Sequence, residues 1–340
     1  MTIQTFKNTL LALFTFCSIT ISSQTFRNDS VKSFVDKSLD VIKANAVDTE
    51  NITLIKETLY TKAKKFESYS ELAPVYSEVF TLLKDYHGGL RYKGKTYGWT
   101  KPQAAENAYI KSRLGKEKFV VAKALNKNTG YIRIPGNDDF AFKKVDSIAN
   151  DIAAHINSVN SKRIKSWIID LRTNAGGNMY PILLGLKEFI SNQDIVFGGF
   201  RNGKGESSGK WEIQGGRMLI DGIELKRQRH LALPLKKDAR IIILTSCYTA
   251  SAGEMTAISL IGRKNTVVVG EPTAGYTTAV QGFRITQEAG INLSTDYVVD
   301  RNLKIYSNTV TPDLEMIGGD NLEDLAEDGK ILRALKLLKK

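Results

Sequence analysis

The sequence predicts an α/β protein in which a helical N-terminal region precedes a core of alternating strands and helices. Apolar residues recur at helical spacing up to about residue 86, whereas runs of strand length alternate with helical stretches from about residue 118. Residues 239–245, Ala-Arg-Ile-Ile-Ile-Leu-Thr, are apolar enough for a fully buried strand. A turn of small residues joins this strand to a helical stretch at 255–261. Strands that alternate with helices in this way favour an α/β core.

The first 23 residues have the pattern of a secretory signal. Lys7 gives a positive start, residues 10–21 are apolar, and two serines at the end offer a cleavage point. The apolar stretch is short for a membrane span, and the bulky residue before Cys17 argues against a lipid-modified cysteine. We therefore expect a secreted or periplasmic protein. No later segment is long and apolar enough to cross a bilayer.

The predicted parts after the signal are an N-terminal helical region at 27–115 and a core domain at 118–340. In the first part, helices are expected near 31–42, 52–59 and 75–83. The elements expected in the core are, in order, strands at 119–125 and 130–134, a helix at 140–159, a strand at 164–171, a helix at 180–190, hairpins at 196–236, a strand at 239–245, a helix after 251, strands at 266–270, 282–285, 291–299 and 303–306, and a helix at 321–338.

The composition, with 42% hydrophobic and 25% charged residues, is ordinary for a globular protein. The formal net charge is +12, with basic clusters at 226–230, at 236–237 and at the C-terminus. Aromatic residues do not interleave with these clusters as a single-strand-binding surface requires, so we expect no nucleic-acid partner. The sequence has neither H-E-x-x-H nor G-x-G-x-x-G, and we expect neither a metal site nor a cofactor.

Ser251 is the candidate nucleophile, within the segment 249–254, Thr-Ala-Ser-Ala-Gly-Glu. A small-residue turn between a buried strand and a helix exposes a hydroxyl and places the next N–H groups at a helix N-terminus, where negative charge is favoured. Thr249 or Ser251 is also explained as a helix cap. Cys247 is an alternative nucleophile, although a cysteine at a buried strand end is more often a small core residue. It is the single cysteine after the signal, so we expect no intrachain disulfide.

A serine nucleophile needs a general base, and the three histidines of the sequence all precede Ser251. This order excludes the α/β-hydrolases, in which the histidine follows the serine. His155 lies in the amphipathic stretch 140–159 and His230 in a basic loop, so we expect them on the surface or in packing contacts. His87 ends a predicted helix and precedes two glycines that permit a tight turn and close approach of another segment. A glycine after a helix C-cap explains the same pattern.

A second turn is the candidate for the other part of an oxyanion hole. Residues 170–177 read Asp-Leu-Arg-Thr-Asn-Ala-Gly-Gly, and a glycine-rich turn before a helix can aim a backbone N–H at a substrate carbonyl. The expected oxyanion donors are the N–H groups of Ala252 and of Gly176 or Gly177. The alternative is a plain turn, with an internal ion pair between its aspartate and its arginine.

Several motifs together resemble the tail-specific (C-terminal-processing) serine peptidase family. They are 130–136 (Gly-Tyr-Ile-Arg-Ile-Pro-Gly), 170–177, 249–254, 269–275 (Val-Gly-Glu-Pro-Thr-Ala-Gly) and 311–313 (Thr-Pro-Asp). The similarity covers roughly residues 85–315. It implies a ββα core of the kind shared with ClpP and crotonases, and hydrolysis of peptide bonds through an acyl-enzyme on Ser251.

Two departures from the family pattern indicate a branch of it. The better-known members pair the serine with a lysine at the position of Tyr276, and Lys264 is the nearest lysine after the serine. They also carry a PDZ domain before the core, and the segment between His87 and 130–136 is too short for one. Without the lysine and the PDZ domain, the chain resembles the tricorn-like and retinoid-binding-protein-like branch of the family. Members of this branch keep a histidine at the position of His87. The resemblance therefore implies His87 as the general base.

The acid that would orient this histidine is less evident. Tricorn-type members have a glutamate shortly before the Pro-Asp motif, but residues 306–310, Tyr-Ser-Asn-Thr-Val, contain none. Asp300 is our candidate substitute, with an aspartate of a turn as the alternative interpretation. Glu254 and Glu271 adjoin the motifs and are expected to be structural.

These observations predict a secreted serine peptidase that acts on peptides or proteins, and they leave its oligomeric state open. One alternative is a binding protein that keeps the fold without catalysis and whose cleft takes a peptide or an apolar ligand. The missing lysine favours that reading. Another is a crotonase-type acyl-CoA enzyme, against which the secretion signal argues because acyl-CoA is cytosolic.

Overall fold

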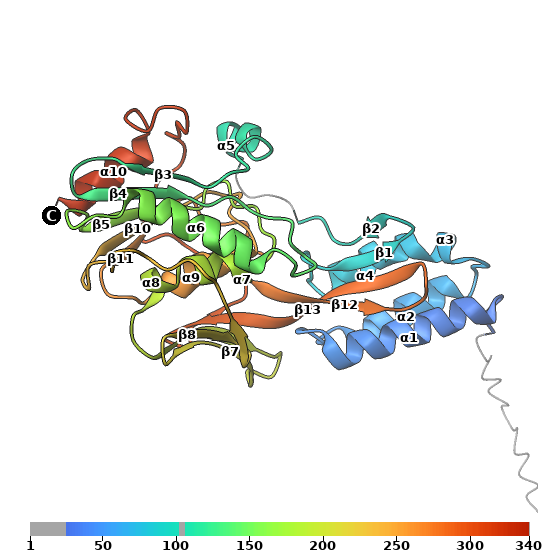
Figure 1. Cartoon of the computed structure of the whole chain (residues 1–340). Coiled ribbons are helices and arrows are strands. Elements are labelled where there is room, and N and C mark those ends of the chain that lie inside the picture. The colour runs from blue at the N-terminus through green and yellow to red at the C-terminus, as the bar shows by residue number, and fades with distance from the viewer. Residues whose placement is uncertain (1–24, 102–105, 340) are drawn as a thin grey trace, which may run out of the picture.

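The computed structural model describes residues 25–101 and 106–339 (Figure 1). Within these residues the chain forms a mixed α/β fold with two sheets, one of nine strands and one of six. The α/β prediction is confirmed. The predicted signal at 1–23 lies outside the described residues.

The six-stranded sheet lies at the centre of the core, in the order β15-β11-β10-β5-β4-β3. Its strands are β3 (Val121–Ala124), β4 (Thr129–Arg133), β5 (Ser166–Asp170), β10 (Arg240–Thr245), β11 (Thr266–Gly270) and β15 (Leu314–Glu315). All are parallel except β3, which is antiparallel to β4. The carboxyl ends of the parallel strands therefore meet at one edge, where α/β sheets place their ligand sites.

Helices cover both faces of this sheet, which explains why β10 has no polar face. The helices of the core are α6 (Val145–Val159), α7 (Met179–Gly185), α8 (Lys187–Ile190), α9 (Ala252–Leu260) and α10 (Gly329–Leu338). Ile241 and Ile243 share a core with residues of α6, α7 and α9. Ile242 and Leu244 pack with residues of α10 instead. Because side chains alternate along a strand, a strand between two cores is apolar throughout.

The nine-stranded sheet links the core to the N-terminal region through its long strand β13 (Figure 1). The order is β2-β1-β13-β6-β7-β8-β9, with β12 and β14 also paired to β13. The bounds are β1 (Gly89–Tyr92), β2 (Lys95–Tyr97), β6 (Ile195–Arg201), β7 (Ser207–Gln214), β8 (Arg217–Ile220), β9 (Ile223–Leu225), β12 (Thr278–Arg284), β13 (Ala289–Asp300) and β14 (Ile305–Tyr306). The strands β6 to β9 confirm the hairpins predicted for 196–236.

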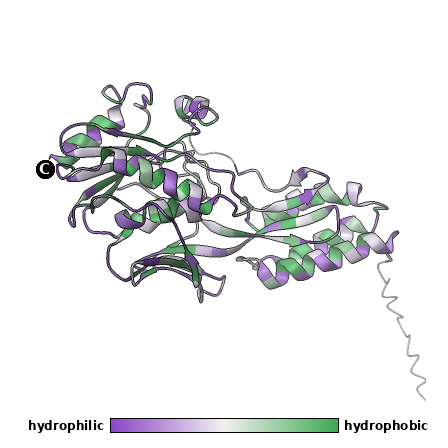
Figure 2. Ribbon diagram, viewed as in Figure 1, coloured by the Kyte–Doolittle hydropathy of each residue, from purple (hydrophilic) through white to green (hydrophobic). Residues whose placement is uncertain are grey.

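The N-terminal helices share one hydrophobic cluster with β1 and the first half of β13. These helices are α1 (Asp29–Asn45), α2 (Ile52–Ala63), α3 (Tyr69–Leu72), the 3-10 turn η1 (Ala73–Val75) and α4 (Tyr76–Leu82). Apolar and polar residues alternate around α1 (Figure 2), and its buried face contains Val31, Phe34 and Ile42. Ile291 and Leu293 of β13 belong to the same cluster, whereas Val298 belongs to the core. One strand thus contributes to both hydrophobic clusters.

The structure differs from the predicted elements in several places. The helix expected from residue 140 begins at Val145, because the Asp139 carboxylate accepts the N–H groups of Lys143 and Lys144 and ends the preceding loop. The closing helix begins at Gly329 rather than at 321. The strands β1 and β2 and the helix α5 (Ala108–Arg113) were not predicted, since β1 pairs with β13 about 200 positions later in the chain. Among the described helices, none has the length and apolarity of a membrane span.

Candidate active site

Ser251 lies in the turn between β10 and α9 and has a strained backbone, with φ +48° and ψ −112°. Positive φ is rare for a residue with a side chain and clusters at functional sites. The turn is fastened to the neighbouring strand end, because Ser246 Oγ donates to the Arg172 carbonyl at 2.6 Å and Thr249 Oγ1 to the Leu171 carbonyl at 2.9 Å. Ser251 is partly exposed and borders a cavity of about 640 Å³.

The buried side chain of Glu254 bonds to the turn from inside the protein. Its Oε2 accepts the Ser251 N–H at 2.8 Å, and its Oε1 accepts the Gly275 N–H at 2.7 Å and the Thr273 hydroxyl. Burial raises the pKa of Glu254 to about 7. One carboxyl group therefore joins the Ser251 turn to the segment 273–276, which agrees with the structural role expected for it.

The glycine-rich turn after β5 lies directly against Ser251. A side-chain carbon built on Gly176 would be 3.1 Å from Ser251 Cβ, and one built on Gly177 would overlap the Asn137 carbonyl oxygen. Both glycines have positive φ, +112° and +116°. Asn137 bonds to this turn on both sides, accepting the Asn178 N–H and donating to its carbonyl. Only glycine fits this turn.

Two backbone N–H groups beside Ser251 are unbonded among the described residues, those of Ala252 and Gly177. The N–H of Gly176 donates to Asn174 Oδ1 at 3.1 Å and is already used. The sequence left Gly176 and Gly177 as alternatives, and hydrogen bonding distinguishes them. Ala252 and Gly177 both line the cavity at Ser251 and have the free donors that an oxyanion needs.

His87 contacts Thr278, a residue that lines the same cavity. Its Nδ1 lies 3.0 Å from Thr278 Oγ1, and Thr278 lines the cavity together with Ser251. The imidazole ring packs edge-on against Tyr276, with ring centroids 5.0 Å apart. Burial lowers the pKa of His87 to about 4, so the ring is neutral at pH 7. Tyr276, at the position of the lysine in the better-known members, thus contacts the histidine.

Asp300 is not brought to His87. Its Oδ1 accepts the N–H groups of Asn302 and Lys304, and its Oδ2 accepts the Tyr306 hydroxyl at 3.1 Å. These bonds close the turn between β13 and β14. Ser294, which lies beside Thr278, is six positions earlier on the same strand, a separation of about 20 Å. The contacts of Asp300 are those of the alternative, an aspartate of a turn.

Other residues considered from the sequence have structural contacts. The pair Asp170–Arg172 is fully buried at 2.7 Å, as its alternative reading predicted, and Arg172 also contacts two further aspartates. Glu271 bonds to the buried Lys330 at 2.8 Å. The remaining candidates lie apart from the site or inside the protein: His155 on α6, His230 on an exposed loop and Cys247 in the core.

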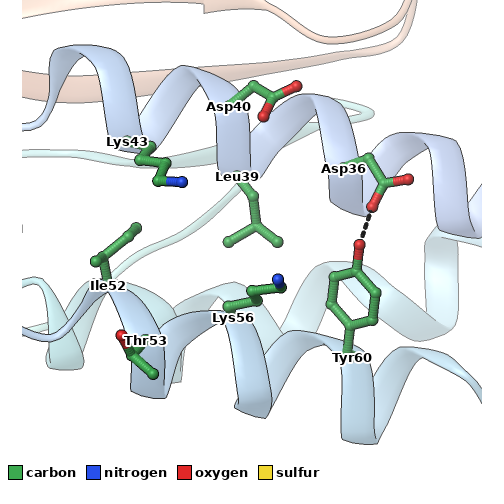
Figure 3. A pocket seen from close by; sticks show the side chains of 8 residues that line it. All are labelled: Asp36, Leu39, Asp40, Lys43, Ile52, Thr53, Lys56 and Tyr60. Atoms are coloured by element: carbon green, nitrogen blue, oxygen red, sulfur yellow. Dashed lines mark hydrogen bonds between the residues drawn. The ribbon is translucent and has the colours of Figure 1, made fainter. Parts of the chain in front are cut away.

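The wall of the cavity at Ser251 contains both apolar and polar side chains. Beside the residues already named it is lined by Arg91, Phe140, Phe142, Met179, Tyr180, Phe200, Met255, Ala279, Val280, Gly282 and Asn292. Three of these apolar side chains, Phe140, Phe142 and Val280, are exposed to solvent. A hollow of about 600 Å³ between α1 and α2 (Figure 3) has Asp36, Lys56 and Tyr60 in its wall and no serine or histidine. The described residues contain no cluster of side chains suited to a metal ion.

Two side chains next to His87 were not predicted from the sequence. Thr278 contacts the ring and Ser294 contacts Thr278, but both lie on ordinary strands and have no local signal. Asp85 did have one, because an aspartate two residues before a turn commonly accepts the next N–H groups, as it does here from His87 and Gly88.

Comparisons with known proteins point to one peptidase family. Residues 128–316 match the model of peptidase family S41. The chain is 28% identical over 263 residues to the nisin-resistance protein of Lactococcus lactis subsp. lactis, covering 76% of each. A lipoprotein from Streptococcus agalactiae has a similar fold, with a TM-score of 0.66, 22% identity, and 91% and 96% of the two chains covered. So does a photosystem II D1 C-terminal processing protease, with a TM-score of 0.58, 12% identity, and 91% and 97% covered.

Proposed function

The chain belongs to peptidase family S41, and we propose that it is an active serine peptidase that cleaves peptide bonds through an acyl-enzyme on Ser251. The observation that carries this proposal is the strained Ser251 beside the two unbonded N–H groups of Ala252 and Gly177. Ser251 is also the N-cap of α9, and Glu254 accepts its N–H. A helix cap does not need a positive φ, whereas strain at a small residue beside two N–H groups that line the same cavity suits the stabilisation of an oxyanion.

His87 is the proposed general base. With Nδ1 at Thr278, the other ring nitrogen, Nε2, is left for the serine hydroxyl. Nε2 takes the hydroxyl proton while Oγ bonds to the substrate carbonyl carbon, and the N–H groups of Ala252 and Gly177 bind the oxyanion. The protonated ring then gives its proton to the leaving amine as the C–N bond breaks. Water, deprotonated by the same nitrogen, releases the acyl group from Ser251.

The neutral state of His87 supports this role. A base must be unprotonated at the working pH, and burial lowers the pKa of His87 to about 4. The site therefore keeps its base in the reactive form from neutral to mildly acidic pH.

Two cavities at the site support an extended peptide as the substrate. The residues that line the larger cavity include Gly177, Ser251 and Thr278. A second, of about 460 Å³, is lined by the preceding positions Ala175, Ala250 and Tyr276. Both border the same three chain segments, so a peptide bond at the serine has room for residues on either side of it. We also include nisin among the test peptides, because one relative is a nisin-resistance protein.

The finer assignments of fold and location are part of the same proposal. Residues 1–23 act as a cleaved signal for a secreted or periplasmic protein, 27–115 as the helical cap and 118–340 as the peptidase domain with a ClpP/crotonase-like ββα core. The parallel sheet with α9 packed beneath it and the helices beside β13 support this division.

The test uses the mature protein, a fluorophosphonate probe and two substrates, an unfolded protein and nisin. We expect the probe to add one label at Ser251, found by peptide mass spectrometry, and both label and hydrolysis to be lost in Ser251→Ala. Ser207→Ala changes an exposed serine of β7 and should keep both. Labelling and hydrolysis that persist in Ser251→Ala would place the nucleophile at another residue. A wild-type protein that neither labels nor hydrolyses would favour a non-catalytic binding protein.

A further inference from the structure

The His87 ring lies at the end of a chain of hydroxyl groups that terminates on a buried carboxylate. Nδ1 of His87 is 3.0 Å from Thr278 Oγ1, which is 2.8 Å from Ser294 Oγ. Ser294 Oγ in turn donates to Asp85 Oδ1 at 2.8 Å. The four groups come from the turn after α4, from β12 and from β13. Asp85 and Ser294 are buried, which shields the bond between them from solvent.

We propose that Asp85 is the acid of this site and that it positions His87 through Ser294 and Thr278. The proposal rests on the proposed function, in which His87 is the general base. Asp85 and the two hydroxyl residues are positioning residues, since they act on the substrate only through the imidazole.

The order of donors and acceptors follows from the carboxylate. The Asp85 oxygens accept in each of their hydrogen bonds among the described residues, from three main-chain N–H groups and from the Ser294 hydroxyl, which therefore gives its single proton to Asp85. With that proton committed, Ser294 Oγ accepts from the Thr278 hydroxyl. Thr278 Oγ1 has then used its own proton and accepts from His87, which places the ring proton on Nδ1. The lone pair is left on Nε2, the nitrogen that must take the serine proton.

The Asp85 carboxylate is fixed by its other partners. It accepts the main-chain N–H groups of His87 at 3.0 Å, Gly88 at 2.8 Å and Ser294 at 2.9 Å. A side-chain carbon at Gly88 would collide with Asp85 Oδ2 and with a β13 carbonyl, so the glycine permits this approach. The same carboxylate thus fixes the backbone of His87 and the first hydroxyl of the chain.

Charge interactions agree with this geometry. Burial lowers the pKa of His87 to about 4, and the charge of Asp85 acts in the opposite direction. Tyr276 is the aromatic neighbour packed on the other side of the ring. Asp85 is the charged group that acts on this histidine, and it stabilises the imidazolium that forms when the serine proton is taken.

A second group of Thr278, its main-chain carbonyl, could fix the His87 tautomer in place of the hydroxyl. The backbone of Thr278 also acts on His87 and raises the pKa of the ring. If the Thr278 carbonyl alone fixed the tautomer, the Thr278 hydroxyl would be dispensable. Thr278→Val keeps the shape and the carbonyl and removes the hydroxyl, so it separates the two arrangements. Thr295→Val is the matched control, because this neighbouring β13 hydroxyl donates to Asp296, outside the chain to His87.

The measurements are the pH profile of kcat/KM, kcat and KM separately, and the ¹⁵N NMR signals of the His87 ring. We expect Thr278→Val and Ser294→Ala to lower kcat by about 100-fold, at the low end of a general-base contribution, with little change in KM. The acid limb of the profile should move to lower pH, and the NMR signals should change from the Nδ1–H form to a mixture of tautomers. Thr278→Ser should restore the wild-type values, and Thr295→Val should retain them.

The outcomes separate this proposal from the proposed function. If His87→Ala abolishes activity while Thr278→Val and Ser294→Ala match Thr295→Val in rate, profile and tautomer, the hydroxyl chain is overturned and the carbonyl suffices. If His87→Ala keeps the full rate, the proposed base itself is wrong. Asp85→Asn should behave as Thr278→Val does, and circular dichroism will show whether it still folds. Thr278→Val remains decisive if that variant does not fold.

Discussion

The turn that carries Ser251 and the turn that carries His87 differ in how far apart in the sequence their contacting residues lie. The Ser251 turn joins β10 to α9, and its inner contact comes from Glu254, three residues later. The His87 turn follows α4, and its ring contacts a residue 191 positions away. The first turn lies in a contiguous strand, turn and helix and is also bonded to Leu171 and Arg172, whereas the second contacts β12 and β13, which come about 200 positions later. Its chemistry is therefore more sensitive to changes far away in the chain.

The largest expected effect tests whether the two turns act as one unit. Ser251→Ala should lower kcat on the order of 10⁶-fold, because a nucleophile has no substitute in an acyl-enzyme mechanism. His87→Ala should lower it by about 10²- to 10⁴-fold or more, and the double variant should be no worse than Ser251→Ala. Progress curves on a fluorogenic peptide measure all three. Effects that multiply in the double variant would mean that the residues act independently.

A smaller effect is expected at the oxyanion donors, which belong to the local turns. Gly177→Ala places a methyl group against the Asn137 carbonyl and displaces the free N–H, so kcat should fall by about 10²- to 10³-fold. Gly205→Ala is the control, since Gly205 also has positive φ, +78°, but has open space around it. An equal loss of kcat in both variants would show that backbone strain alone causes the effect.

The two turns also predict opposite pH dependences of stability. Burial raises the pKa of Glu254 from 4.5 to about 7, so native protein keeps a proton that unfolded protein has lost, and stability falls between pH 4.5 and 7. Burial lowers the pKa of His87 from 6.5 to about 4, so unfolded protein binds the extra proton, and stability rises between pH 4 and 6.5. Each contribution amounts to about 3 kcal/mol, and they nearly cancel.

Glu254→Gln removes the contribution of Glu254 to the pH dependence of stability and leaves that of His87. Its free energy of unfolding should rise with pH between 4 and 6.5 by about 3 kcal/mol more than that of the wild type. Urea unfolding at a series of pH values measures the difference, and His87→Ala should show the opposite slope. Parallel curves for wild type and Glu254→Gln would show that this carboxyl group does not titrate as its burial indicates.

The smallest expected effect is a gain in stability at the nucleophile. Ser251 has φ +48°, which glycine adopts without strain, so Ser251→Gly should raise the free energy of unfolding by about 1 kcal/mol while abolishing hydrolysis. Ser251→Ala, which keeps the strain, is the matched comparison. A Ser251→Gly protein less stable than Ser251→Ala would mean that the turn is not strained.

Elements that depend on local contacts were predicted correctly from the sequence. The buried strand at 239–245, the turn and the following helix were predicted because apolar period, small residues and helical spacing lie within about two dozen positions. The family match at 128–316 has the same origin in contiguous motifs. The acid was not identified in this way. Asp300 was chosen for its nearness to a motif, but its carboxylate closes its own turn, a contact that any aspartate before such a turn can make.

The α/β class, the family and the strand–turn–helix that carries Ser251 could be predicted from the sequence, because each depends on residues that are neighbours in the chain. The hydrogen bonds that join His87 to Thr278, Thr278 to Ser294 and Ser294 to Asp85 could not, because they depend on the tertiary fold. Hydroxyl groups on strands carry no pattern of their own, and their partners here are as many as 209 positions apart. Pairing of β12 with β13 and packing of β13 against α1 and α4 bring them together, and no local signal encodes that register.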